Sequence, residues 1–123
     1  MHRNTILAAC VVGFLSVAGG AFGAHALEDL LTPQRLETYE IGTQYARMHA
    51  PVLLVLGLIG DRIPLKSLQR IALAFVIGVT IFTGSLWVLA ITGVSKLGMV
   101  TPFCGVFLLL GWLGLAATVW RLR

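Results

Sequence analysis

Charged residues are scarce in this chain. They make up 11% of its 123 residues, whereas 58% are hydrophobic. A water-soluble domain of this size carries roughly a quarter charged residues, so this composition excludes a soluble globular domain. The length suits a single domain, and the mean hydropathy of +0.92 favours a protein that lies within a lipid bilayer.

The sequence also lacks the features of several functional classes. The net charge is +4, but no basic face lies on a water-exposed element, which excludes nucleic acid as a partner. Of the two cysteines, Cys10 falls near the inner end of the first predicted helix and Cys104 near the outer end of the fourth. They cannot meet across the membrane, so we expect no disulfide. No nucleophile–base pair is present in the pattern. We therefore expect a protein that is not an enzyme and that holds neither a metal ion nor a cofactor.

The few charges divide the chain into long uncharged stretches. Their lengths are 24, 13, 25 and 24 residues, for the intervals 4–27, 48–60, 71–95 and 97–120. A helix needs about 20 apolar residues to cross a hydrocarbon core of roughly 30 Å, so three stretches are long enough and the second is short. These lengths predict an all-α, polytopic membrane protein, a four-transmembrane-helix bundle with an interfacial amphipathic extension before the second span. The predicted spans are residues 5–27, 43–60, 70–92 and 103–121 of one membrane domain, 1–123.

The positions of lysine and arginine predict the orientation, because cytoplasmic loops carry an excess of both. With the N-terminus in the cytoplasm, three basic residues lie outside, namely Arg35, Arg47 and Lys96. The other six then lie inside: Arg3, Arg62, Lys66, Arg70, Arg121 and Arg123. We therefore predict a multi-pass protein of the cell (inner) membrane with both termini in the cytoplasm.

GGAFGAHA, residues 19–26, closes the first uncharged stretch. Its glycines do not form a nucleotide-binding loop, because that fingerprint needs a preceding strand. A signal peptide cleaved after Ala26 is an alternative, but signal cores usually run about 7 to 15 residues, and we expect the first helix to be retained. Small residues at four-residue intervals are typical of a surface on which helices pack closely. Here they are Ser16, Gly19, Gly20, Gly23 and Ala24.

Several motifs, taken in order along the chain, resemble one small membrane family. They are GAFGAHAL at 20–27, the Glu40-x-Gly42-x-x-Tyr45-x-x-x-His49-Ala50 spacing, GSLWVLAITG at 84–93, Thr101-Pro102 and Gly111-Trp112. They resemble the YgdD/YwdK-like inner-membrane proteins (domain of unknown function 423), which have a eukaryotic transmembrane relative. The resemblance implies a retained first helix and four spans, and it implies no activity. Pro51 and Cys104 depart from the family pattern, so we expect a local kink and a looser helix start.

Residues 33–60 read as one long helix. Thr32 supplies a capping hydroxyl and Pro33 suits the first turn, and no strong stop follows. Pro51 removes a backbone hydrogen bond and should bend the helix. The uncharged part covers only about 20 Å of the core. The turns from Glu40 to Arg47 must therefore enter the membrane as well.

Counting about 1.5 Å per residue places the polar residues at two levels. Near the outer surface, His25 lies level with Glu40 and near Glu37 and Tyr39. The remaining candidates gather near the middle of the membrane: Tyr45, Arg47, His49, Thr83, Ser85 and Trp112. Ionisable residues within a membrane are functional candidates. In the alternative structural reading, Tyr39, Tyr45, Trp87 and Trp120 anchor the interface, and Thr80, Thr83 and Ser85 bond helix backbones.

Three functions remain open at this point. The first is a non-enzymatic accessory subunit whose partners are the lipid bilayer and a homo-oligomer or larger membrane complex. The second is an oligomeric transporter of a small solute or protons, lined by Glu40, Arg47 and His49. The third is a redox accessory protein that binds quinone or lipid. A haem held by His25 and His49 is excluded, because the count separates them by about 15 Å while axial ligands share one iron.

Overall fold

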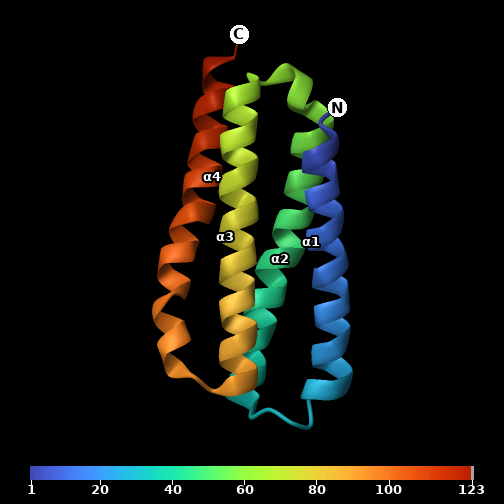
Figure 1. Cartoon of the computed structure of the whole chain (residues 1–123), viewed down its shortest axis with the longest axis vertical. Coiled ribbons are helices and arrows are strands. Elements are labelled where there is room, and N and C mark those ends of the chain that lie inside the picture. Colours follow the sequence, from blue (N-terminus) through green and yellow to red (C-terminus); the bar gives the residue numbers. More distant parts are fainter. Residues whose placement is uncertain (123) are drawn as a thin grey trace.

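The computed structural model describes residues 1–122, and Arg123, one of the basic residues expected inside, lies outside them. Every regular element in that range is helical, as predicted. The four long helices run side by side (Figure 1). They are α1 (Arg3–Phe22), α2 (Pro33–Ile59), α3 (Leu65–Thr92) and α4 (Thr101–Arg121), with short helical segments at Gly23–Leu27, Gly60–Arg62 and Ser95–Met99.

The ends of the helices follow local sequence signals. Thr32 caps α2, because its hydroxyl accepts a hydrogen bond of 3.3 Å from the backbone N–H of Arg35, and Pro33 occupies the first turn. The helix then continues through Pro51 to Ile59, which confirms the single long helix. Gly93 ends α3 at φ +73°, a left-handed conformation that favours glycine.

Three helical segments are long and apolar enough to cross a membrane: Arg3–Leu27, Leu65–Thr92 and Ser95–Arg121. At 27 residues, α2 is about 40 Å long, so its length would suffice, but charged and polar side chains occupy its first half. The length of α2 therefore suits a membrane span, whereas its composition does not. The fourth span and the interfacial extension stay predictions.

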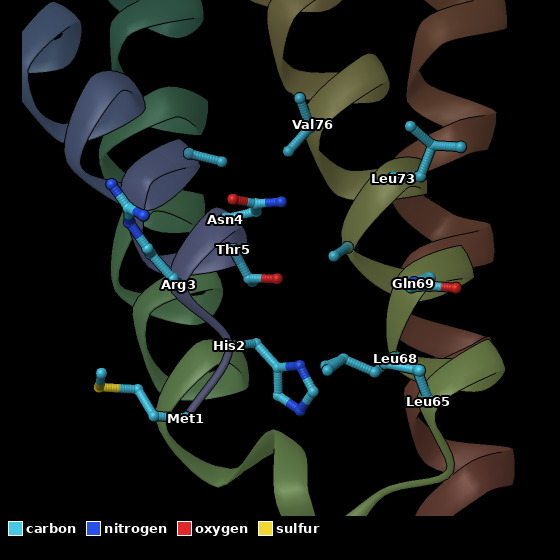
Figure 2. Close-up of a pocket in the computed structure, with 12 residues that line it drawn as sticks. Met1, His2, Arg3, Asn4, Thr5, Leu65, Leu68, Gln69, Leu73 and Val76 are labelled. Carbon is cyan, nitrogen blue, oxygen red and sulfur yellow. The ribbon is translucent and has the colours of Figure 1, made fainter.

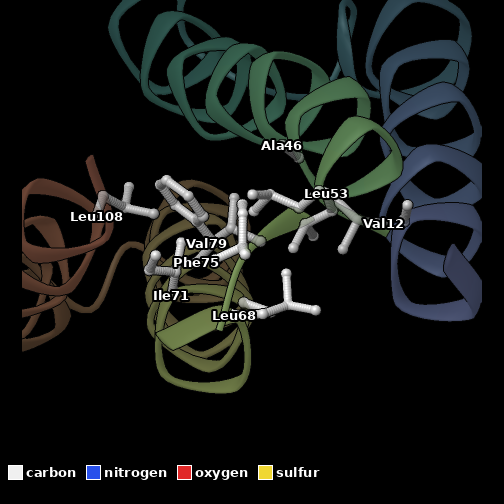
Figure 3. Packing of buried hydrophobic residues seen from close by; sticks show 12 residues of the cluster. Val12, Ala46, Leu53, Leu68, Ile71, Phe75, Val79 and Leu108 are labelled. Carbon is white, nitrogen blue, oxygen red and sulfur yellow. The ribbon is translucent and has the colours of Figure 1, made fainter. Parts of the chain in front are cut away.

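The helices form an open layer rather than a closed bundle. Each packs on its neighbour in the chain, α1 on α2, α2 on α3 and α3 on α4. Within residues 1–122, no Cα atom of α4 comes within 8 Å of one in α1 or α2. Seen from the end in Figure 3, the helices zigzag, with α4 and α1 at opposite edges. The predicted bundle is thus corrected to a layer whose edge helices do not meet.

The core lies along α2 and α3, which have neighbours on both sides. Its most deeply buried apolar side chains are Leu53, Leu56, Leu68, Phe75 and Val79, several of which are drawn in Figure 3. In contrast, α4 buries only a narrow strip, formed by Cys104, Leu108 and Gly111. Most of its apolar side chains therefore face the surroundings.

The small-residue stripe of α1 receives aromatic side chains. A Cβ atom added at Gly19 would lie 2.3 Å from the indole of Trp87, and one at Gly23 would lie 2.6 Å from the ring of Tyr39. Ser16 is buried, and its hydroxyl bonds the Gly13 carbonyl within α1. The predicted packing residues thus have different roles: Gly19 and Gly23 contact aromatic rings, whereas Ala24 is exposed.

Candidate functional site

His49 lies at the centre of a polar contact between α2 and α4. Its side chain is 1% exposed. Its Nδ1 lies 2.7 Å from the Tyr45 carbonyl oxygen, and the indole N–H of Trp112 donates to its Nε2 at 3.2 Å. A carbonyl only accepts and an indole N–H only donates. The two contacts therefore require the neutral imidazole with its hydrogen on Nδ1.

Aromatic rings surround this imidazole. The ring centroids of Phe75 and Trp112 lie 5.4 and 6.0 Å from that of His49. The ring of Tyr45 lies parallel to the imidazole at 6.4 Å and contacts Phe82 at 4.5 Å. Both nitrogens of His49 are satisfied inside this aromatic shell, so the arrangement fixes the position of α4 relative to α2.

A furrow runs between α2 and α4 on either side of the His49–Trp112 bond. One part has a volume of about 410 Å³ and is lined by Tyr45, His49, Phe82 and α4 residues that include Gly105. The other, of about 300 Å³, is lined by Pro51, Val52, Val55, Leu56, Ile59, Trp112 and Leu115. The furrow is largely apolar and is open along its length.

Two of the predicted central residues lie elsewhere. The hydroxyl of Thr83 donates to the Gly42 carbonyl of α2 at 2.8 Å. Ser85 donates to the Phe82 carbonyl at 2.9 Å and lies 3.0 Å from the Thr101 hydroxyl at the start of α4. Thr83 therefore bonds the backbone of α2, Ser85 bonds its own helix and the start of α4, and neither takes part in the His49 contact.

Glu40 and Arg47 lie on a different surface from His49. They line a crevice of about 290 Å³ between α1 and α2, together with Gly20, Gly23, Ala24, Tyr39, Thr43 and Gln44. Both charged side chains are exposed, and within residues 1–122 neither forms an ion pair. Within one described chain, Glu40 and Arg47 therefore face a different surface from His49.

His25 lies in a single π-helical turn, Gly23–Leu27, that follows α1. Its side chain is exposed, and in the described chain no hydrogen bond or ion pair joins it to Glu37, Tyr39 or Glu40. The predicted outer cluster around His25 is therefore not formed.

Tyr39 was expected at the membrane interface and is instead buried. Its ring stacks on Trp87 with centroids 5.3 Å apart, and its hydroxyl donates to the Gly19 carbonyl at 2.6 Å. The Trp87 indole in turn donates to the hydroxyl of Thr43 at 3.0 Å. These contacts connect α1, α2 and α3. In the sequence, only Gly19 and Gly23 indicate these contacts, because glycine leaves room for the two rings.

Arg35 is a further residue that the sequence did not single out. Its guanidinium donates to the carbonyls of Ala90 and Ile91 at 2.7 and 2.6 Å. The last carbonyls of a helix lack partners within the helix and attract cations. Arg35 thus ties the start of α2 to the end of α3.

A second furrow lies between α1 and α3, on the other face of the layer. Its larger part, of about 430 Å³, is shown in Figure 2, where Asn4 and Thr5 face α3 across the opening and the His2 ring points toward Leu68. At this end of the chain the Met1 ammonium hydrogen-bonds the Asp61 carboxylate and lowers the pKa of that carboxyl. The rest of the furrow, of about 210 Å³, includes Gly84 and Trp87 in its lining.

Comparison with known proteins places this architecture in a family. A family profile described as "Protein of unknown function (DUF423)" matches residues 19–105. A UPF0382 membrane protein of Staphylococcus epidermidis is 39% identical over 108 residues, 88% of this chain and 88% of the relative. YwdK of Bacillus subtilis is 33% identical over 109 residues, 88% and 89% of the two chains.

The inner membrane protein YgdD of Escherichia coli is 32% identical over 117 residues, 89% of this chain and 84% of the relative. No solved structure matches. These relatives confirm the resemblance seen in the motifs. They carry membrane-protein names throughout, in agreement with the three apolar helices. The chain is an integral membrane protein and belongs to the DUF423 (UPF0382) family.

Proposed function

We propose that this protein is a non-enzymatic helix-packing component of a larger membrane assembly, either a homo-oligomer or an accessory subunit. In this proposal α2 forms the second of four spans, its outer turns lie at the interface, and both termini are cytoplasmic. The open layer supports the proposal, because two furrows remain uncovered on opposite faces of the described chain.

The observation that carries the proposal is a pair of glycines that line the furrows and against which no side chain of the described chain packs. Within residues 1–122, a Cβ atom at Gly84 or at Gly105 would meet no heavy atom within 4 Å. Gly84 lines the furrow between α1 and α3, and Gly105 lines the one between α2 and α4. Small residues let helices approach closely in lipid, where no hydrophobic force drives them together. Each furrow therefore offers a partner helix a point of close approach.

Mass measurement of the protein purified in mild detergent from native membranes tests the proposal. We expect a complex heavier than the monomer, and we expect Gly105→Leu to dissociate it because the added side chain fills the furrow without an internal clash. Ala117→Leu is the matched control, since Ala117 is an exposed α4 residue outside the furrow lining. A monomer with no co-purifying protein, unchanged by Gly105→Leu, would contradict the proposal.

Transport of a small solute is the second candidate, and the charged crevice of Glu40 and Arg47 favours it. Because His49 lies on the other surface with both nitrogens bonded, a pathway would depend on Arg47 and not on His49. Flux into proteoliposomes that is lost in Arg47→Gln and retained in His49→Gln is the result expected for transport.

A further inference from the structure

The crevice between α1 and α2 has the form of a binding site for a small polar group. We propose that it binds a headgroup that carries a phosphate and a primary ammonium, the chemistry of an aminophospholipid. The phosphate lies at Arg47 and the ammonium at Glu40. This site is separate from both furrows. It rests on the proposed crossing of the membrane by α2, but not on the proposed assembly.

The shape of the crevice comes from small residues on one wall and long polar ones on the other. Gly20 of α1, with Gly23 and Ala24 of the π-helical turn that follows it, leaves a space of about 290 Å³ beside α2. A Cβ atom at Gly20 would lie 3.8 Å from an Arg47 guanidinium nitrogen. The guanidinium therefore lies directly over the glycine wall, inside the crevice.

The two charges in the crevice have no partner within residues 1–122, where the ion pairs join Asp61 to Met1 and His2. An arginine within a membrane is costly when it stays unpaired, and a phosphate is its geometrically matched partner. Glu40 and Arg47 are seven residues apart on one face of α2, about 10 Å along the helix. The crevice thus presents a cation and a carboxylate at its two ends.

The order of these charges matches the order in a membrane lipid. Glu40 lies nearer the end of α2 that meets the membrane surface, and Arg47 lies deeper. In an aminophospholipid the phosphate is attached next to the glycerol, whereas the ammonium lies farther out. This match holds whichever leaflet is involved, because both orders run from the core toward the nearer surface.

The depth of Arg47 also suits a phosphate. Gly20, beside the guanidinium, lies 17 residues after Arg3, about 26 Å along α1. The hydrocarbon core is roughly 30 Å thick, so with Arg3 at one boundary the guanidinium lies just inside the other. This differs from the middle of the membrane, where the count along the second helix placed Arg47, because the guanidinium lies beside Gly20 of α1. A lipid phosphate lies just outside this boundary, within reach of a long arginine side chain that extends toward the surface.

The neighbouring polar groups leave one hydrogen-bonding side chain for the ligand. The hydroxyl of Thr43 already donates to the Tyr39 carbonyl and accepts from Trp87. Gln44 lies between Glu40 and Arg47 in the crevice lining, and the described chain gives its amide no hydrogen-bond partner. Its amide N–H can donate to a phosphate oxygen. The carboxylate of Glu40 accepts hydrogen bonds from a primary ammonium, which a quaternary ammonium cannot donate.

Lipid titration of the delipidated protein in detergent, followed by native mass spectrometry, tests this assignment. The probes are phosphatidylethanolamine, phosphatidylcholine (quaternary ammonium), phosphatidylglycerol (no ammonium) and water-soluble O-phosphoethanolamine. We expect phosphatidylethanolamine to bind preferentially. Competition by O-phosphoethanolamine at similar concentration would identify a free headgroup as a sufficient ligand, whereas competition only at large excess would identify the lipid as the source.

Two substitutions separate the two ends of the site. Arg47→Gln should weaken phosphatidylethanolamine binding at least about tenfold, the loss typical of a charge-assisted hydrogen bond, and Arg47→Lys should restore part of it. Glu40→Gln should leave phosphatidylcholine binding unchanged and abolish the preference for phosphatidylethanolamine. Glu37→Gln and Arg62→Gln are matched controls, because both residues are exposed and lie outside the crevice.

The ratio of phosphatidylethanolamine to phosphatidylcholine binding distinguishes a lost ligand contact from misfolding. Glu40 is exposed, and within residues 1–122 its substitution breaks no ion pair. Equal binding of the three lipids by the unmodified protein would overturn the proposal. The same conclusion would follow if Arg47→Gln bound phosphatidylethanolamine as tightly as Arg62→Gln did.

Discussion

The indole N–H of Trp112 donates to Nε2 of His49 across the furrow between α2 and α4, at a distance of 3.2 Å. The backbones of these helices do not come within 8 Å of each other in the described chain, so two side chains make the connection. In lipid such a polar contact stabilises helix association, because the alternative partners of both groups are poor. The bond therefore links the edge helix α4 to α2, in addition to the packing of α4 on α3.

Removal of this bond should cost a measurable part of the stability. In a double-mutant cycle with His49→Phe and Trp112→Phe, we expect a coupling of about 0.6 to 1.7 kcal/mol, from the average to the largest value typical of hydrogen bonds between membrane helices. Thermal or denaturant unfolding in detergent provides the free energies. Trp120→Phe is the control, since Trp120 is 90% exposed. Additive effects of the two substitutions would show that the bond contributes nothing.

Gly19 of α1 and Gly84 of α3 permit a second test with a matched pair. Gly19→Ala should destabilise the protein by about 1 to 3 kcal/mol, the usual cost of overpacking, because the new Cβ atom would lie 2.3 Å from Trp87. The displaced indole would also lose its stacking on Tyr39. Gly84→Ala should instead be neutral or stabilising by up to about 1 kcal/mol, since alanine favours helices and nothing lies within 4 Å. Equal melting temperatures for the two variants would refute this contrast.

The sequence predicted the helices well because their signals are local. Charges delimit the uncharged runs, Thr32 and Pro33 mark the start of α2, and Gly93 ends α3. The arrangement of the helices could not be predicted in the same way. In a soluble protein an apolar face marks the core, but here lipid-facing side chains such as Leu113, 67% exposed, are as apolar as buried ones. Hydropathy therefore does not tell a closed bundle from an open layer.

The candidate site, too, could be predicted only in part. The level of His49 and Trp112 along their helices was predictable from the rise per residue, and the structure joins them. The rotation of each side chain about its helix was not predictable, so Thr83 and Ser85 bond other groups. Tyr39 was assigned to the interface because tyrosine is frequent there. In the structure Gly23 makes room for its ring inside, and Gly19 makes room for the Trp87 ring on which it stacks.

Arg35 should stabilise the end of the layer where α2 begins and α3 ends. Arg35→Gln removes its two hydrogen bonds to the last carbonyls of α3, and we expect a loss of about 1 to 2 kcal/mol because one partner is charged. Hydrogen exchange should rise first at the end of α3. Arg62→Gln controls for the loss of a positive charge. Unchanged exchange of the amides near Ile91 in Arg35→Gln would show that water replaces the guanidinium without cost.

Cysteine labelling decides whether α2 crosses the membrane. With Cys10 and Cys104 replaced by alanine, Gln34→Cys and Met48→Cys each place one thiol on α2, and both positions are exposed on the protein surface. Maleimides react with the thiolate, which needs water to form. If α2 is a span, a membrane-impermeant maleimide applied to spheroplasts should label Gln34→Cys and leave Met48→Cys unlabelled. If α2 lay outside the bilayer, both would react, because Met48 is 55% exposed in the described chain. Lys66→Cys, labelled only after permeabilisation, would place the other end of α2 in the cytoplasm and complete the crossing.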